Sequence, residues 1–347
     1  QEATKLPGIP EGYCNTICGS SDTGKTLIIS HLIASAQNKG IIPVIYDTEN
    51  NMSWTLLQDL GFKCTPIYGD VEVEDVDTET GEITSHIENQ IIGYDGDFIY
   101  FNSNILAQKY GDWDYSAGKK VSKKRKEAVL DDIAKSIREL IDEQDEIGQG
   151  FLFVWDSIGS ISSWKSYASK SNNNQWDAGA ISEKFSGIWN NLIPSSRKVS
   201  SKYTNTFVSV NKIWLDSTSS PVGLPTMKLK GGEAMRYAAH GLLIRMGGHL
   251  TAGTKKLTAV SKGATYRYGT VSKIEVLKNH LSSPWSVSYS GEIICTPHGL
   301  ITREDLPAYK KTYISTILKE LEKNIGGGGK INESDVKFIE EEGEMPE

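Results

Sequence analysis

A glycine-rich segment near the start of the chain has the residue types and spacing that bind phosphate. Residues 19–26 read GSSDTGKT, which matches the pattern G-x-x-x-x-G-K-[ST] at every required position. Lys25 is expected to neutralise the β and γ phosphate oxygens of a nucleotide, and Thr26 offers a hydroxyl to Mg²⁺, which prefers hard oxygen ligands. The backbone N–H groups that would surround the phosphates belong to Gly19, Ser20, Ser21, Asp22, Thr23 and Gly24.

The flanking residues supply the context that such a loop needs. Residues 13–18 form a short apolar run typical of a buried strand, and residues 27–38 have the spacing of a helix that ends at Gly40. A strand thus enters the loop and a helix leaves it, so the amino end of the helix dipole favours an anion there. The alternative, a glycine-rich surface turn, does not require these two elements.

Further polar residues follow apolar runs that read as strands. The strands are expected at residues 41–46, 151–155 and 206–210, and they are followed by Glu49, Asp156 and the pair Asn211 and Lys212. Helices are expected between them, at residues 126–146 and 181–192. Strands that alternate with helices form a mostly parallel sheet, in which the carboxyl ends lie at one edge. The sequence therefore predicts an α/β fold with its chemistry at that edge.

Two carboxylates at this edge have the chemistry of a nucleotide hydrolase. Asp156 is expected to hold the magnesium ion together with Thr26, while Glu49 would act as the general base that deprotonates the attacking water. Simpler roles stay open for both residues. Asp156 could cap the backbone of the next segment, and a glutamate after a strand is often merely exposed.

Composition and charge limit the remaining choices. The 347 residues are 38% hydrophobic and contain no apolar run long enough to span a bilayer, and the start shows no secretory signal. The four cysteines are scattered, which is typical of a reducing compartment. We therefore expect a cytoplasmic protein without a membrane partner. The net charge of −7 argues against indiscriminate nucleic-acid binding.

The charges are distributed unevenly. Residues 69–97 contain ten Asp or Glu and no Lys or Arg, and they read as an inserted acidic hairpin. Residues 119–126, within an inserted basic segment at 117–126, contain six basic residues. The core is expected over residues 1–302, a C-terminal helix over 303–325 and a flexible acidic tail over 326–347. Both charged insertions could equally be solvated surface.

The chain resembles the RecA family of strand-exchange ATPases, including the recombinases encoded by phages. The likeness extends from about residue 6 to residue 301, and its divergence favours a phage or a related mobile element. The motifs that carry it occur in family order: GSSDTGKT, YDTEN, FLFVWDSIGS, VSVNK, KGGEAMRYAA and VSKIEVLKNHLSSPW. The resemblance implies a RecA-like P-loop NTPase core with an antiparallel extension of the sheet, and ATP and Mg²⁺ as cofactors.

The resemblance also implies roles for individual residues. Asn211 and Lys212 fall where the family senses the γ-phosphate, although bacterial members have a glutamine at the position of Lys212. Lys278 falls where a neighbouring subunit inserts a cation toward the phosphates, so the resemblance implies a homo-oligomer, a filament or a ring, with the active site at a subunit interface. A surface lysine at a strand end is the alternative.

Two loops inherit the DNA-binding role from this resemblance, residues 166–179 and 213–232. Single-stranded and double-stranded DNA are the implied partners. In the second loop, cations and exposed backbone N–H groups could both contact phosphates. The residues concerned are Lys228, Lys230, Gly231 and Gly232. Arg236, just after the loop, would either join them or bridge subunits. A merely solvated linker is the alternative for either loop.

Three functions follow from these observations. The first is a DNA-dependent ATPase that promotes homologous pairing in recombination and repair. The second is a hexameric helicase motor of the same fold, which would normally have a separate N-terminal domain and an arginine finger. The third is an assembly or regulatory protein that ATP switches between shapes, with the acidic hairpin and tail as partner surfaces.

Overall fold

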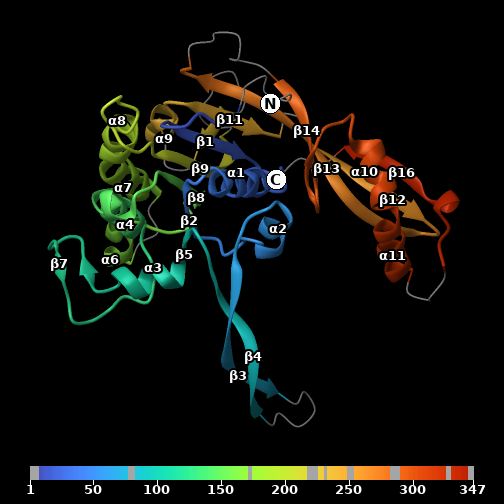
Figure 1. The fold of residues 1–347 in the computed structure, drawn as a ribbon, viewed down its shortest axis with the longest axis horizontal. Helices are drawn as coiled ribbons and strands as arrows, with labels where there is room; N and C mark the ends of the chain where they lie inside the picture. Colours follow the sequence, from blue (N-terminus) through green and yellow to red (C-terminus); the bar gives the residue numbers. More distant parts are fainter. Residues whose placement is uncertain are drawn as a thin grey trace.

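A mixed β-sheet forms the centre of the molecule (Figure 1). The computed structural model describes residues 8–76, 83–170, 174–216, 226–229, 233–247, 254–281, 290–325 and 330–342. Adjacent strands of one part of the sheet all run parallel. In spatial order these strands are β11 (Leu242–Met246), β1 (Cys14–Gly19), β9 (Thr206–Asp216), β8 (Phe151–Ile158), β2 (Ile42–Asp47) and β5 (Ile99–Asn102).

Helices cover both faces of this parallel part, because its strands are apolar on both sides. In β8, Phe153 and Trp155 pack on one face, while Leu152 and Val154 pack on the other. The second face carries α1 (Lys25–Asn38) and α2 (Trp54–Asp59). The first face carries α3 (Ser103–Tyr110), α4 (Leu130–Asp142), α7 (Asn174–Gly187) and the π-helical turn Ile188–Leu192. In α4, Ile133 and Ile137 are buried on the predicted apolar face.

The sheet continues beyond β11 with antiparallel strands, so the predicted α/β class with a mostly parallel sheet and an antiparallel extension is confirmed. The added strands are β12 (Thr254–Ser261), β13 (Ala264–Asn279), β14 (Ser290–Thr296), β15 (Gly299–Ile301) and β16 (Lys337–Glu342). Helices α10 (Leu306–Thr312) and α11 (Ile314–Asn324) pack on β12 and β13 through Leu306, Ile317 and Leu321. This lobe lies at the right of Figure 1.

Two expectations for the C-terminal part differ from the structure. The single helix expected over residues 303–325 is two helices, α10 and α11, separated at Tyr313. The acidic tail expected to be flexible includes β16, which pairs antiparallel with β12. Between these strands Nζ of Lys255 lies 3.4 Å from Oε1 of Glu340, an ion pair that offsets the negative charge of the acidic strand.

The acidic insertion is a long antiparallel hairpin, as the sequence predicts. Its strands are β3 (Thr65–Val76) and β4 (Ile83–Asp95), and in Figure 1 the hairpin projects from the body of the molecule. The basic segment follows α3 and includes the short pair β6 (Trp113–Asp114) and β7 (Lys119–Lys120). The remaining elements are α5 (Gln144–Ile147), α6 (Trp164–Ser169), α8 (Ile193–Ser195), β10 (Thr226–Leu229), α9 (Glu233–Ala238) and the 3₁₀ turn Glu333–Asp335. None of the helices among the described residues combines the length and the apolarity that a membrane crossing requires.

Candidate functional site

The glycine-rich loop lies between β1 and α1, as the sequence predicts. Gly24 directly precedes α1 with φ +88°, a left-handed conformation that glycine adopts without a steric cost. A Cβ atom at Gly24 would collide with Sγ of Cys295, and a Cβ atom at Gly19 would collide with the carbonyl oxygen of Met246. Packing therefore requires glycine at both positions, and conformation requires it at Gly24 as well.

The Lys25 side chain lies against this loop. The residue is 7% exposed, and its Nζ donates a hydrogen bond to the carbonyl oxygen of Ser20. Burial lowers the pKa of Lys25, and the nearby Asp156 carboxylate opposes that shift. A buried cation and the positive amino end of α1 are thus both present at the loop, which fits an anionic ligand such as a polyphosphate.

Thr26 and Asp156 meet at the edge of the sheet although they come from distant parts of the sequence. Asp156 follows the apolar run of β8, and its Oδ2 accepts a hydrogen bond from the Thr26 hydroxyl at 2.9 Å. The residue is 4% exposed, and burial raises the pKa of its carboxyl to about 6. The Thr26 hydrogen bond opposes that rise, whereas the negative charges of Glu49 and Asp47 add to it.

This pair of oxygen ligands fits Mg²⁺. The ion prefers hard oxygen atoms and usually takes one or two carboxylates of the protein, with water and phosphate as its other ligands. Among the described residues, no group of three or more His, Cys, Asp or Glu side chains could hold a metal ion, at this edge or elsewhere. Thr26 and Asp156 could hold magnesium here only with phosphate and water as its other ligands.

Glu49 lies in a turn after β2 and is held by three neighbours. Its Oε1 accepts a hydrogen bond from the Ser157 hydroxyl and lies 3.0 Å from Nζ of Lys212, and its Oε2 accepts one from Asn51 at 3.1 Å. Burial raises the pKa of Glu49, but the hydrogen bonds from Ser157 and Lys212 outweigh it and leave the pKa below its usual value. The carboxylate is therefore ionised at neutral pH, as a general base must be.

Asp47 positions the turn that carries Glu49, a role that the sequence analysis missed. Its two carboxylate oxygens accept backbone hydrogen bonds from Asn51 and Met52, each at 3.0 Å. The hydroxyl of Tyr100, in the neighbouring strand β5, donates to Asp47 at 3.0 Å. Asp47 is 1% exposed. A buried carboxylate after an apolar strand is the signal that could have identified it.

Asn211 and Lys212 lie at the same edge, but within β9 and not after it, because the strand continues to Asp216 where it pairs with β10. Asn211 is buried and pairs in register with Cys18, the residue before Gly19, so it lies beside the start of the phosphate loop. Lys212 is half exposed and reaches Glu49. A pocket of about 380 Å³ lies at this place and is lined in part by Glu49, Asn51, Ser160 and Lys212. The structure thus brings Lys25, Thr26, Glu49, Asp156, Asn211 and Lys212 to one edge of the sheet.

Comparisons with known proteins give limited help. No protein-family model matches the chain, and no curated protein matches it. Among solved structures, the chain is similar to the crystal structure of the RadB recombinase, with 13% sequence identity and a TM-score of 0.44. The alignment covers 84% of this chain and 91% of that one. A likeness of this degree says nothing about the chemistry of the site.

Lys278 lies away from the phosphate loop of its own chain. It pairs with Leu243 of β11, whereas Gly19 is level with Met246 at the other end of that strand. Its Nζ donates hydrogen bonds to the carbonyl oxygens of Arg236 and Tyr237, at 2.8 and 3.2 Å. Burial lowers the pKa of Lys278, and the charge of Arg236 adds to that shift. The structure does not bring Lys278 to the phosphate site within one chain.

The candidate DNA-binding residues fall partly outside the described residues. The structure does not describe Lys230, Gly231 and Gly232, nor much of the rest of the loop 213–232. Lys228 is exposed on β10, paired across from Trp214 of β9, and Arg236 is exposed on α9. The first loop, which we expected to lack structure over residues 166–179, is largely helical, because α6 ends at Ser169 and α7 begins at Asn174.

Proposed function

We propose that this chain is an ATP-dependent, DNA-binding recombinase with a RecA-like core, which binds single-stranded DNA and promotes homologous pairing and strand exchange. The observation that carries the ATPase part is the 2.9 Å hydrogen bond between Thr26 and Asp156, at the edge where Lys25 and the Glu49–Lys212 pair also lie. A phosphate-binding loop, two oxygen ligands for a metal ion and an ionised carboxylate are the parts that ATP hydrolysis needs.

Each residue has a separate task in this proposal. The backbone N–H groups of the glycine-rich loop and the Lys25 ammonium group bind the phosphate oxygens. Mg²⁺, held by Thr26 and Asp156, supplies positive charge against the phosphates when it is bound. Glu49 orients the attacking water and accepts its proton at a carboxylate oxygen. Ser157 and Lys212 hold that oxygen in place, so Lys212 both positions the base and is available to sense the γ-phosphate.

The DNA-binding part of the proposal rests on the resemblance and on the basic residues near the end of β9. Lys228, Lys230 and Arg236, with the backbone of Gly231 and Gly232, would contact phosphates without regard to sequence. Replacing Lys228 and Lys230 by alanine should lower single-strand affinity and DNA-stimulated ATPase together, and it should flatten the salt dependence of binding. Unchanged affinity at several salt concentrations would remove this loop from the site.

The placement of Lys278 supports a shared active site. Since Lys278 lies far from the phosphate loop of its own chain, a role near the phosphates would require a loop from a neighbouring copy. Mixing a Lys278→Ala chain with a Lys25→Ala chain tests this. Each variant alone should be inactive, and the mixture should recover part of the ATPase activity, because some sites then combine an intact loop with an intact Lys278.

The function is tested by ATP hydrolysis with and without single-stranded DNA, followed by a strand-pairing assay. The proposal predicts that DNA stimulates hydrolysis and that the protein pairs a single strand with a homologous duplex. Efficient unwinding of a forked duplex without pairing would favour the helicase. ATP binding without any response to DNA would favour the ATP-switched assembly protein.

A further inference from the structure

The β3–β4 hairpin has one face on which apolar and acidic side chains are mixed. In its register Glu72 lies opposite Ile87, and Tyr68 lies opposite Ile91. Because alternate residues of a strand share a face, the face contains isoleucines of β4 beside acids of β3. We call it the acidic isoleucine face. Its members are Asp70, Glu72, Glu74, Ile83, Ile87 and Ile91.

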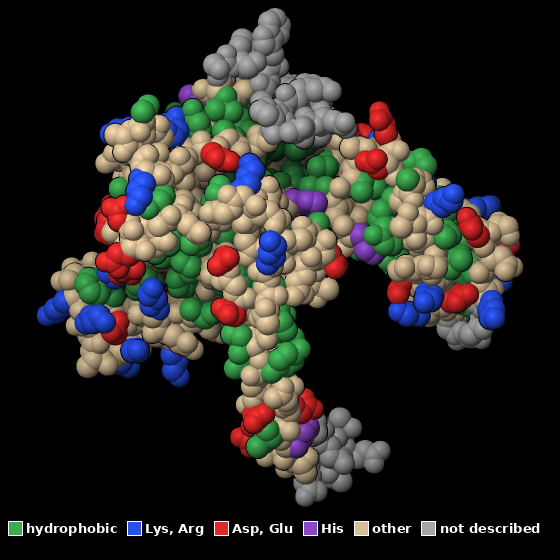
Figure 2. Space-filling model, in the orientation of Figure 1, with side chains coloured by type: hydrophobic (Ala, Val, Ile, Leu, Met, Phe, Trp, Pro, Cys, Tyr) green, Lys and Arg blue, Asp and Glu red, His purple; other side chains and the backbone are tan. Residues whose placement is uncertain are grey.

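The isoleucines of this face are unusually exposed. Ile83, Ile87 and Ile91 are 61%, 73% and 47% exposed. Figure 2 shows hydrophobic side chains along the hairpin and acidic ones in its outer half. A two-stranded hairpin is marginally stable in water without a third element to cover it, and a row of exposed isoleucines typically marks an interaction surface. The face therefore requires a partner with apolar and basic groups.

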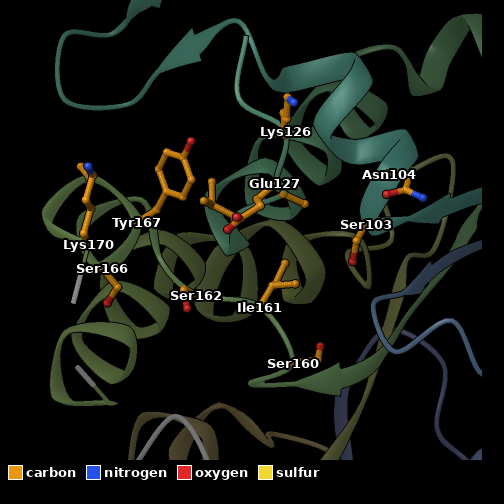
Figure 3. Close-up of a pocket in the computed structure, with 13 residues that line it drawn as sticks. Ser103, Asn104, Lys126, Glu127, Ser160, Ile161, Ser162, Ser166, Tyr167 and Lys170 are labelled. Carbon is orange, nitrogen blue, oxygen red and sulfur yellow. The ribbon is translucent and has the colours of Figure 1, made fainter. Parts of the chain in front are cut away.

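The same chain contains a groove with those properties. Two hollows of about 740 and 370 Å³ adjoin each other and share Asn104 and Lys126 in their walls. We call them together the lysine groove. Its walls include the exposed lysines Lys124, Lys126 and Lys170, and the apolar residues Ala107, Ile161 and Tyr167. Figure 3 shows Tyr167 between Lys126 and Lys170.

The wall of this groove is fixed by a buried ion pair. The Arg125 guanidinium donates to both carboxylate oxygens of Asp132, at 2.8 and 3.1 Å. Its central carbon lies 5.3 Å from the centre of the Trp164 ring and 6.0 Å from that of Tyr167. Since Arg125 is neighbour to Lys124 and Lys126, this anchor holds the two lysines at defined places instead of leaving them on a loose loop.

We propose that the acidic isoleucine face of one chain docks in the lysine groove of a second copy of this chain. The isoleucines would contact the half-buried Ile161 and Tyr167, while Asp70, Glu72 and Glu74 would pair with the lysines on the walls. This charge complementarity identifies the occupant, because the acids of the face match the exposed lysines of the groove. The interaction depends on residues outside the phosphate loop and is independent of the ATPase assignment.

The hairpin is better placed to reach the lysine groove of a second copy than the groove of its own chain. The β3 strand has 12 residues and therefore extends about 40 Å. Figure 1 shows the hairpin projecting away from α3 and α6, the helices that line the groove. Nucleic acid is the competing occupant of the groove. It would leave the isoleucines of the hairpin uncovered, whereas a second copy would cover them.

The experiment is sedimentation velocity of the full chain without nucleotide or DNA, at low and high salt. Glu72→Lys reverses a charge on the acidic isoleucine face, whereas Glu88→Lys makes the same change on the opposite face, because Glu88 pairs with Val71. Glu72→Lys should weaken self-association by about tenfold at low salt. Glu88→Lys should leave it near the wild-type value, and Ile87→Ser should weaken it without any change of charge.

A mixing experiment distinguishes a second copy from the other occupants. Glu72→Lys chains keep an intact groove, and Lys124→Glu/Lys126→Glu chains keep an intact hairpin. Each should self-associate more weakly than the wild-type chain, and the equimolar mixture should associate more strongly than either variant alone. The proposal is overturned if the wild-type chain is monomeric throughout, if the mixture associates no more strongly than the variants alone, or if Glu72→Lys and Glu88→Lys behave alike. It is also overturned if the groove variant loses single-strand binding while its self-association is unchanged, since the groove then serves nucleic acid.

Discussion

Replacing Asp156 by asparagine should stabilise the protein while it removes the metal ligand. The carboxyl is 4% exposed, and burial raises its pKa from 3.8 to about 6. A shift of about 2 pKa units corresponds to about 3 kcal/mol, which the folded protein loses when this group is ionised. Asparagine keeps an oxygen that can accept the 2.9 Å hydrogen bond from Thr26, so the neighbouring contact is preserved.

The gain in the free energy of unfolding of the Asp156→Asn variant should grow as the pH rises. Because the folded pKa of Asp156 lies above the unfolded value, the folded state binds the proton more tightly. Well below pH 3.8 the carboxyl is neutral in both states, so the wild-type and variant proteins should be equally stable. As the pH rises from about 4 to about 6, between the unfolded and folded pKa values, the wild-type protein loses stability and the asparagine variant does not. The difference should approach about 3 kcal/mol at pH 8.

Urea unfolding of both proteins at pH 4, 6 and 8 in a metal chelator measures this difference. The same variant should not hydrolyse ATP, and Mg²⁺ with ATP should raise the melting temperature of the wild-type protein alone. A gain of equal size at every pH would show that the carboxyl titrates normally. A loss of stability at pH 8 would contradict the assignment of Asp156 as a buried, destabilising ligand.

Three further predictions follow from the same site and its surroundings. Lys212→Met should raise the pKa of Glu49 and move the acid limb of the pH–rate profile to higher pH, since the lysine lowers that pKa in the wild-type protein. An unmoved limb would show that Lys212 does not control the ionisation of Glu49. Gly24→Ala should abolish binding of a fluorescent ATP analogue, because φ is +88° and the new Cβ would collide with Cys295; normal binding would contradict the loop geometry. Arg125→Ala should lower the free energy of unfolding by about 3–5 kcal/mol, since the buried Asp132 carboxylate loses its counter-charge and keeps only hydrogen bonds from Tyr115 and Val129, and a loss below about 1 kcal/mol would show that the pair is dispensable.

Much of the candidate site could be predicted because its residues follow a topological rule. Each of these side chains follows a run of apolar strand residues, and in a parallel sheet the carboxyl ends of such runs share an edge. The residues are Lys25, Thr26, Glu49, Asp156, Asn211 and Lys212. The contact between Asp47 and Tyr100 joins strands that lie more than 50 residues apart in the chain. No local pattern shows that contact.

The C-terminal lobe shows where local reasoning fails. The acidic composition of β16 is typical of a solvated tail, and its strand conformation depends on pairing with the lysines of β12. Arg303 connects this strand to the rest of the lobe through ion pairs with Glu340 at 2.7 Å and Glu292 at 2.8 Å. Those partners are distant in sequence, so the charge pattern of each segment alone predicts exposure.

In our proposal Glu49 activates water at a nucleotide held by the phosphate loop, and its amide variant separates this step from nucleotide binding. ATP affinity and single-turnover hydrolysis should be measured for the wild-type protein and the Glu49→Gln variant in the presence of Mg²⁺ and single-stranded DNA. We expect the Glu49→Gln variant to bind ATP with unchanged affinity and to hydrolyse it more slowly by about 10²–10⁴-fold, because glutamine keeps the shape of the side chain but cannot accept the proton. A Glu49→Gln variant that hydrolyses ATP at the wild-type rate would contradict the proposal.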